Sequence, residues 1–193
     1  DGDGYVHDIS IKETSYLKDR DVAVESDMDI ISSAEKYVFR KGRVLIDDAL
    51  DFTLSGQFEG EQIDLKLAGS DLDIIKTLGL LPSESRSAFD EYASSGKMAF
   101  DATLKGVFGK TENPRVQANF KLDRASVKRK GSSIELEQLI GSGSIDNGEK
   151  RSASTTTLVF DNLNGQINGD PFSASVRVSN FTKPSIIGDA DFK

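Results

Sequence analysis

The chain has 193 residues, no cysteine, a formal net charge of −8 and a sequence pI near 4.8. A chain of this length can bury roughly 70% of the surface that its unfolded form exposes, so a core can form without disulfides or structural metal ions. The lack of cysteine excludes a disulfide framework and a thiolate metal site. The acidic balance argues against nucleic acid or an anionic membrane surface as the main partner, because phosphate binding relies on clustered lysine and arginine.

Targeting signals are not evident in the sequence. No apolar run approaches the ~20 residues that a membrane helix needs, and no signal peptide is present. Asp1 is not a natural start, so we expect the chain to be a trimmed piece whose targeting segments could have been removed.

Apolar residues alternate with polar ones through residues 1–69, which predicts strands with one apolar and one polar face. The apolar positions are Tyr5, His7, Ile9 and Ile11; Val22, Val24, Met28 and Ile30; Val44, Ile46, Leu50, Phe52, Leu54 and Phe58; and Ile63, Leu65 and Leu67. The third run is long enough to fold as a hairpin around Asp47 and Asp48. We interpret residues 1–69 as a first β-meander.

The pattern changes in residues 70–96. Residues 70–79 (SDLDIIKTLG) have helical spacing, with Ser70 as a cap and Gly79 as a C-terminal stop. Pro82 then breaks the chain, and a second helix is predicted from Ser83 to about Ser94. We expect this two-helix insertion to cover one end of the sheet, where exposed backbone groups would otherwise recruit other chains.

Alternation resumes in residues 97–193, which we interpret as a second β-meander. Its apolar or small positions are Met98, Phe100, Ala102, Leu104 and Phe108; Val116, Ala118, Phe120 and Leu122; Ile134 and Leu136; Leu158 and Phe160; Leu163 and Ile167; Phe172, Ala174, Val176 and Val178; and Ile186, Gly188, Ala190 and Phe192. The polar partners indicate one wet face, which is typical of an antiparallel sheet. The fold class expected is mainly β, with both meanders in one continuous sheet.

Two features of the strands recur. Residues 54–58 (LSGQF) are echoed by residues 104–108 (LKGVF), and proline opens a strand at both Pro114 and Pro184. Proline lacks the N–H that a ladder needs, so it is tolerated at the first position of a strand. A repeated strand unit is the sign of an extended array, and we expect this array to be cut at Lys193.

Several of these segments resemble AsmA-like proteins of Gram-negative bacteria. SGKMAFDATLKGVFGKTENPRVQANFKLDRASVK (residues 95–128) and TLVFDNLNGQINGDPFSASVRVSNFTKPSIIGDADFK (residues 157–193) are similar to the C-terminal region of that family. KGRVLIDDALDFTLSGQFEGEQIDLKLAGSDLDIIKTLGLLP (residues 41–82) looks like the form found in Bacteroidetes members. The resemblance covers about residues 20–193.

The resemblance implies a long, strongly curved sheet, shaped like a taco, gutter or half-barrel, with an apolar concave face. The family carries no catalytic activity and is associated with outer-membrane homeostasis and with phospholipid transport between the two membranes, like the related bridge-like lipid transfer proteins. Its members lie in the periplasm, anchored to the inner membrane by a helix that this chain lacks. The partners implied are a phospholipid or other amphiphile and envelope proteins, with membrane contact through segments absent from this chain.

Nine residues are the candidates for lining the apolar groove: Phe52, Phe58, Met98, Phe100, Phe108, Val116, Phe120, Phe172 and Val176. Each CH₂ removed from water contributes roughly 0.8 kcal/mol, so apolar contact alone can hold an acyl chain. The sequence leaves open whether these residues form a groove or a core. In the alternative, the sheet closes into a structural sandwich that binds protein or glycan, with its aromatic residues fully buried.

Catalytic and metal-binding arrangements are not evident. The only histidine is His7, and we interpret Asp47 with Asp48 as a turn and Asp71 with Asp73 as acidic residues at a helix N-terminus. The basic stretch 128–131 (KRKG) is typical of a solvated hairpin tip, with contact to lipid headgroups as the alternative. We therefore expect no enzyme activity, no metal and no cofactor.

Overall fold

The computed structural model describes residues 2–5, 10–11, 14–15, 20–80, 90–109 and 112–192, and it describes the first three of these ranges by backbone pairing alone. The strands are β1 (Gly2–Tyr5), β2 (Ser10–Ile11), β3 (Thr14–Ser15), β4 (Val22–Ile31), β5 (Lys36–Ile46), β6 (Leu50–Glu59), β7 (Gln62–Asp73), β8 (Tyr92–Val107), β9 (Arg115–Arg129), β10 (Glu135–Asp146), β11 (Thr157–Ile167), β12 (Asp170–Ser179) and β13 (Ser185–Phe192). The helical elements are η1 (Ser32–Ala34), α1 (Ile74–Leu78) and η2 (Ala153–Thr155), of which η1 and η2 are 3₁₀ turns.

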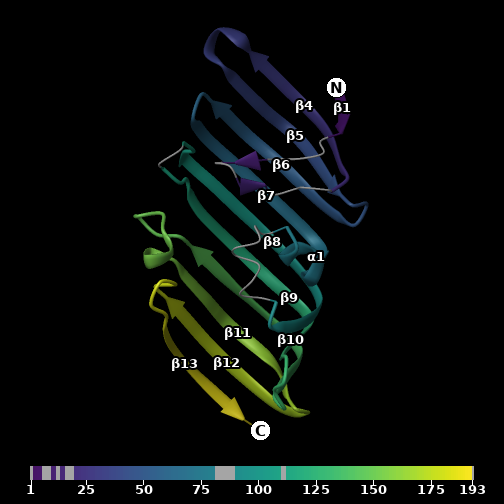
Figure 1. Cartoon of the computed structure of the whole chain (residues 1–193), viewed down its shortest axis with the longest axis vertical. Coiled ribbons are helices and arrows are strands. Elements are labelled where there is room, and N and C mark those ends of the chain that lie inside the picture. The colour runs from purple at the N-terminus through teal and green to yellow at the C-terminus, as the bar shows by residue number, and fades with distance from the viewer. Residues whose placement is uncertain are drawn as a thin grey trace.

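Eleven strands form one antiparallel sheet in the order β1-β4-β5-β6-β7-β8-β9-β10-β11-β12-β13, and β2 pairs with β3 separately. From β4 onward each strand therefore lies beside its neighbours in the chain, as Figure 1 shows. The prediction of a mainly β, antiparallel fold is confirmed. The strands on either side of the middle segment belong to the same sheet, because β7 pairs directly with β8.

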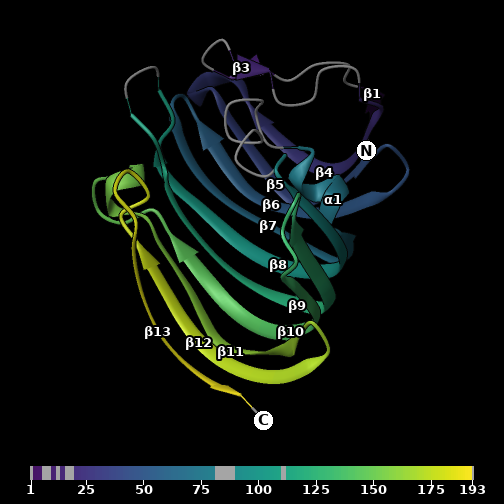
Figure 2. The same ribbon diagram turned by 60° about the horizontal axis from the view of Figure 1, so that its bottom comes forward.

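Among the described strands the sheet is open, with β1 and β13 as its two edges. Figure 2 shows that the strands bend along their length, but the sheet is neither closed nor strongly curled. The strong curvature implied by the family resemblance is therefore not confirmed.

A line of β-bulges crosses four neighbouring strands at one end of the sheet. Asp71 in β7, Arg124 in β9 and Gln138 in β10 have φ values of 56°, 46° and 51°, and Gly96 in β8 has a φ of 102°. The strand register shifts at each of these places. An extra residue in one strand bends it and increases its twist, so these aligned bulges bend the four strands at this place.

The two faces of the sheet differ in chemistry. Side chains of residues directly opposite each other in paired strands lie on the same face. The pairs Leu54–Leu67, Ala102–Ala118 and Leu158–Val178 therefore lie on one face, which we call the apolar face. The other face, called the polar face, carries ion pairs between neighbouring strands, among them Arg43–Asp51 at 2.8 Å. The alternation in the sequence thus corresponds to two continuous faces.

The core lies on the apolar face in two clusters of buried residues. The first contains Val22, Ile46, Leu50, Phe52 and Leu72, and the second contains Ile74, Ala125, Leu139 and Phe172. Helix α1 supplies Ile74, and its Leu78 packs against the second cluster. The helix therefore covers part of the apolar face.

The helices differ in their bounds from the prediction. Residues 70–73 continue β7, and α1 begins at Ile74 with Asp73 as its N-cap, whose Oδ1 accepts a hydrogen bond from the Lys76 N–H at 3.0 Å. The predicted second helix falls mainly on residues 81–89, outside the described residues. Its last part is wrong, because Tyr92–Ser94 pairs with β9 and begins β8. The segment between β7 and β8 is therefore 74–91, narrower than the predicted 70–96.

The echoed segments 54–58 and 104–108 occupy corresponding places on either side of β7. Gly56 and Gly106 have φ values of 124° and 120°, and they pair with Leu65 and Ile63 of β7. Such φ values favour glycine, which explains why both copies carry it. Pro114 and Pro184 immediately precede β9 and β13, as predicted.

Candidate functional site

One line of apolar residues crosses the sheet from β4 to β13, and we call it the central row. Each member lies directly opposite the next in the pairing of neighbouring strands. The row consists of Val24, Val44, Phe52, Gly69, Phe100, Phe120, Gly143, Phe160, Val176 and Gly188. The central row contains no polar or charged residue.

Phenylalanine rings contact each other across glycines in this row. The ring centroids of Phe52 and Phe100 lie 5.9 Å apart on either side of β7, and those of Phe120 and Phe160 lie 5.3 Å apart on either side of β10. A Cβ added at Gly143 would lie 2.5 Å from Cζ of Phe120. The glycine thus leaves the space in which two aromatic rings from non-adjacent strands meet.

A second row runs beside the central row over the same ten strands. It consists of Ser26, Gly42, Leu54, Leu67, Ala102, Ala118, Ile145, Leu158, Val178 and Ile186. Neighbouring strands lie about 4.8 Å apart, so nine steps span roughly 43 Å. The apolar face is therefore longer than the hydrocarbon core of a bilayer, which is ~30 Å thick.

The candidate groove residues differ in burial. Phe52 is 4% exposed and Phe172 is 8% exposed, so both belong to the core clusters. The other seven are half-buried: Phe58, Met98, Phe100, Phe108, Val116, Phe120 and Val176. Further along the apolar face, toward the β13 edge, exposure rises to 69% at Ile186 and 66% at Phe192.

The structure brings most of these candidates onto one face. Phe52, Phe100, Phe120 and Val176 belong to the central row, which joins them across seven strands. Met98 lies opposite Leu122, and Val116 lies opposite Leu104. Two more are held by ring contacts, Phe58 with Phe39 at 5.9 Å and Phe172 with Phe192 at 6.5 Å. Phe108 is the exception, because it follows the end of β8 and lies outside the paired rows.

Among the aromatic residues that share this face, the groove prediction missed Phe39, Phe160 and Phe192, each in contact with a candidate ring, and Tyr37, which lies opposite Phe58. Alternation placed Phe160 and Phe192 in strands. Phe160 lies beside Phe120 because of a strand register that the bulges shift, whereas Phe192 lies directly opposite Phe172 in a pairing without a shift. Glycine at the corresponding point of an intervening strand is the signal that could have linked Phe120 with Phe160.

The polar face neutralises many of its charges by pairing. Asp146 accepts hydrogen bonds from Arg115 Nη2 at 2.8 Å, from Gln117 Nε2 at 2.9 Å and from the Gly148 N–H at 2.7 Å. The bond from Arg115 is the main cause that holds the pKa of Asp146 below its ordinary value. The side-chain bond from Arg43 likewise lowers the pKa of Asp51. These pairs link neighbouring strands on the side away from the apolar face.

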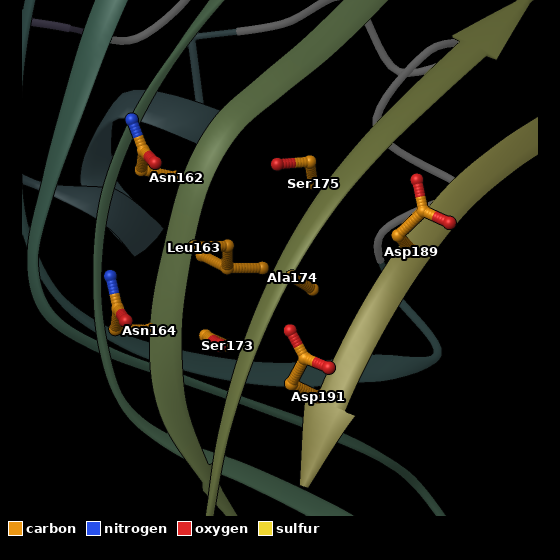
Figure 3. Close-up of a pocket in the computed structure, with 8 residues that line it drawn as sticks. All are labelled: Asn162, Leu163, Asn164, Ser173, Ala174, Ser175, Asp189 and Asp191. Carbon is orange, nitrogen blue, oxygen red and sulfur yellow. The ribbon is translucent and has the colours of Figure 1, made fainter.

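A shallow depression of about 160 Å³ lies over β11, β12 and β13 (Figure 3). Its polar lining consists of Asn162, Asn164, Ser173, Ser175, Asp189 and Asp191. Within the described ranges no group of three or more histidine, cysteine or acidic side chains is arranged to hold a metal ion. The depression offers amide, hydroxyl and carboxylate groups for hydrogen bonding.

The acidic pairs have structural roles. Asp47 and Asp48 form the turn between β5 and β6 with φ values of 50° and 52°, as predicted. Asp73 caps α1, whereas Asp71 lies in β7. His7 lies outside the described residues.

The basic tip between β9 and β10 is bound to neighbouring groups. Lys128 pairs with Glu135 at 2.9 Å, and Arg129 pairs with Glu91 at 2.9 Å. Lys130 Nζ donates to the Asp90 carbonyl at 2.7 Å. The tip is therefore a network of exposed ion pairs.

In the described parts of the chain, no helix has the length and apolar character to cross a membrane. In comparisons with known proteins, no family model, curated protein or solved structure matches this chain.

Proposed function

We propose that the apolar face binds the acyl chains of phospholipids, and that the chain is a non-catalytic segment of an AsmA-like envelope protein supporting outer-membrane homeostasis. In this proposal the segment belongs to an inner-membrane-anchored protein and lies in the periplasm of a Gram-negative bacterium. The sheet bends into a groove along which acyl chains lie or move. The polar headgroup stays in solvent.

The continuous central row is the observation that carries this proposal. Ten strands contribute an apolar or glycine residue to it, and the second row beside it contains only one polar residue, Ser26. A contiguous apolar surface of this extent, bordered by polar residues, is the kind that marks a ligand or partner site. Acyl chains match it because they need apolar contact along a length and no hydrogen bonds.

The distribution of burial also supports an open surface. In a closed sandwich the aromatic residues would be fully buried, yet Phe58, Phe100 and Phe120 are only half-buried. The described strands form one large sheet and one two-stranded sheet, so no second large sheet covers the apolar face within those residues. An amphiphile bound on this face would supply the apolar contacts that the half-buried aromatic side chains lack.

The proposal is tested by purifying the chain from a Gram-negative host without detergent and measuring phospholipid in an organic extract by mass spectrometry. We expect bound phospholipid at near-stoichiometric amounts. Phe120→Asp places a carboxylate in the central row, and because an unpaired charge is unfavourable in an apolar site, bound lipid should fall about tenfold.

Thr103→Asp is the matched control, because it adds the same carboxylate to the neighbouring strand β8 on the polar face, opposite Lys66 and Gln117. This variant should retain the lipid of the unmodified chain. Circular dichroism and the melting temperature establish that both variants fold. The proposal fails if the unmodified chain carries no more phospholipid than an acidic control protein, or if Phe120→Asp unfolds the domain as a closed core would.

A further inference from the structure

We propose that Arg151 binds the phosphate group of a lipid headgroup at one margin of the apolar face, and that the acyl chains extend from this margin along the strands to the central row. This inference rests on the proposed lipid-binding function and adds a headgroup site and an orientation to it. Such a site makes the face selective for lipids that carry a phosphate group.

The apolar face has a margin at each end of its strands, and helix α1 lies at one of them (Figure 2). Nine of the eleven buried apolar residues in the described chain form the two core clusters, which lie toward this α1 end. At the opposite end, called the far margin, Ile63 is buried, but Ile30 and Tyr37 are 58% and 43% exposed. A headgroup therefore reaches water more readily at the far margin, because core side chains fill the α1 end.

Arg151 lies at the far margin, in the loop that joins β10 to β11. Its guanidinium group reaches Gly106 near the end of β8, where an added Cβ would lie 3.3 Å from Nη1 and 3.4 Å from Cζ. Gly106 is opposite Ile63 of β7, and Ile63 shares the apolar face with Leu67 because the two are four residues apart in one strand. The guanidinium group thus lies at the border of the apolar face.

One edge of this guanidinium group is open. Nη1 donates to the Asn113 carbonyl at 3.3 Å and lies 3.8 Å from Oε2 of Glu112. Within the described residues, Nε and Nη2 of Arg151 have no hydrogen-bond or ion-pair partner. Arg43 holds Asp51 through these same two groups, at 3.1 Å from Nε and 2.8 Å from Nη2. The open edge of Arg151 can therefore bind two phosphate oxygens in parallel hydrogen bonds.

Other basic residues near the far margin are already neutralised on the polar face. Three of them form ion pairs at 3.1 Å or less: Lys36 with Glu59, Lys105 with Asp64, and Arg115 with Asp146. The pair of Arg151 with Glu112 is longer than any of these. Arg151 is therefore the basic residue best placed to exchange its carboxylate neighbour for a phosphate group.

The distance from this margin to the central row fits an acyl chain. From Gly106 to Phe100, six residues of β8 span roughly 20 Å. The acyl chains of one leaflet span about half of the ~30 Å hydrocarbon core of a bilayer, roughly 15 Å. A lipid with its phosphate group at Arg151 therefore places the ends of its acyl chains near the rings of Phe100 and Phe120, which lie opposite each other.

Headgroup selectivity tests the site. The chain is incubated with vesicles of dioleoylphosphatidylcholine that contain a minor fraction of dioleoylglycerol, separated from them and extracted for mass spectrometry. Because the two lipids have the same acyl chains, their ratio relative to that in the vesicles reports the headgroup. We expect the unmodified chain to enrich the phospholipid about tenfold. Arg151→Gln should abolish the enrichment by lowering bound phospholipid, with bound dioleoylglycerol unchanged.

Lys150→Gln is the matched control, because it removes the same charge from the neighbouring exposed position of the same loop. This variant should keep the enrichment. Glu112→Gln removes the carboxylate that lies 3.8 Å from Arg151 and should raise bound phospholipid about threefold. Circular dichroism and the melting temperature establish that each variant folds, and the gain expected of Glu112→Gln tests the site even if Arg151→Gln does not fold.

The proposal is overturned if the unmodified chain takes up the two lipids in the proportions of the vesicles, or if Arg151→Gln loses both lipids equally. An equal loss of enrichment in Lys150→Gln, or no gain in Glu112→Gln, would overturn it as well. Calorimetry with glycerol phosphate distinguishes a lipid site from a site for soluble phosphates, and binding as tight as that of the phospholipid would exclude the lipid site. Absence of both lipids from the unmodified chain would refute the proposed function itself, and this inference with it.

Discussion

The apolar face has the same alternation of apolar and polar residues near α1 and near β13, but its side chains are buried near α1 and exposed near β13. Near α1, Leu72 at the end of β7 is 1% exposed, and Ile74 of α1 forms a buried cluster with Ala125 and Leu139. Near β13, Ile186 is 69% exposed and Phe192 is 66% exposed. The central row joins the two regions, because it includes Phe52 and ends at Gly188 of β13. What lies over a strand, and not its own pattern, decides whether its apolar side chains form a core or a surface.

The largest expected effect is on the free energy of unfolding, and substitutions in the two regions should change it by different amounts. Leu72→Ala removes a fully buried side chain and should lower the free energy of unfolding by about 2–5 kcal/mol. Leu158→Ala, in the half-buried second row, should lower it by roughly 1 kcal/mol, because less apolar contact is lost. Urea unfolding followed by circular dichroism measures both. Equal losses would show that the two regions are packed alike.

A smaller effect is expected where the rings of the central row meet. A Cβ at Gly143 would lie 2.5 Å from Cζ of Phe120 and 2.1 Å from the carbonyl oxygen of Val159. Gly143→Ala should therefore destabilise the sheet by about 1–3 kcal/mol through overpacking.

The matched substitution is Ser142→Ala on the polar face, which should change stability by no more than about 0.5 kcal/mol. Thermal unfolding of the two variants compares the faces directly. A neutral Gly143→Ala would mean that both the Phe120 ring and the Val159 carbonyl group move aside freely, in contradiction to fixed packing at this point.

The smallest effect is electrostatic and lies on the polar face. The folded-state pKa of Asp146 is lowered, mainly by the hydrogen bond from Arg115. The ionised carboxylate therefore stabilises the fold above the pKa of the unfolded state, which is about 3.9. This stabilisation is lost as the pH falls through the folded-state pKa. Asp146→Asn should therefore be less stable than the unmodified chain at pH 7, and the difference should shrink below about pH 4. Urea titrations at several pH values measure it, and a pH-independent difference would exclude this ionic contribution.

Much of the sheet could be predicted from the sequence, because the alternation of apolar and polar residues depends on each strand alone. It identified the long strands, the Asp47 turn and the prolines that precede β9 and β13. The start of α1 was wrong because β7 continues through the bulge at Asp71 to bring Leu72 into the core, leaving Asp73 to cap the helix. Spacing alone does not distinguish these two starts.

The candidate face was harder to predict than the strands. Its members share a face because of alternation, but their lateral neighbours depend on how strands slide past one another. Bulges shift the register between β9, β10 and β11, and only the resulting alignment brings Phe160 over Gly143 to meet Phe120. Phe108 was included because it fits the alternation, although β8 ends before it.

The strand order has a consequence for how the molecule comes apart. From β5 to β13 every strand pairs only with its neighbours in the chain. Stability in such an arrangement is close to a sum of nearest-neighbour terms, except where the second core cluster joins Ile74 of α1 to Ala125, Leu139 and Phe172. In the described sheet β13 can therefore separate first, whereas separation of β12 also breaks the contact of Phe172 with the cluster that contains Ile74 of α1.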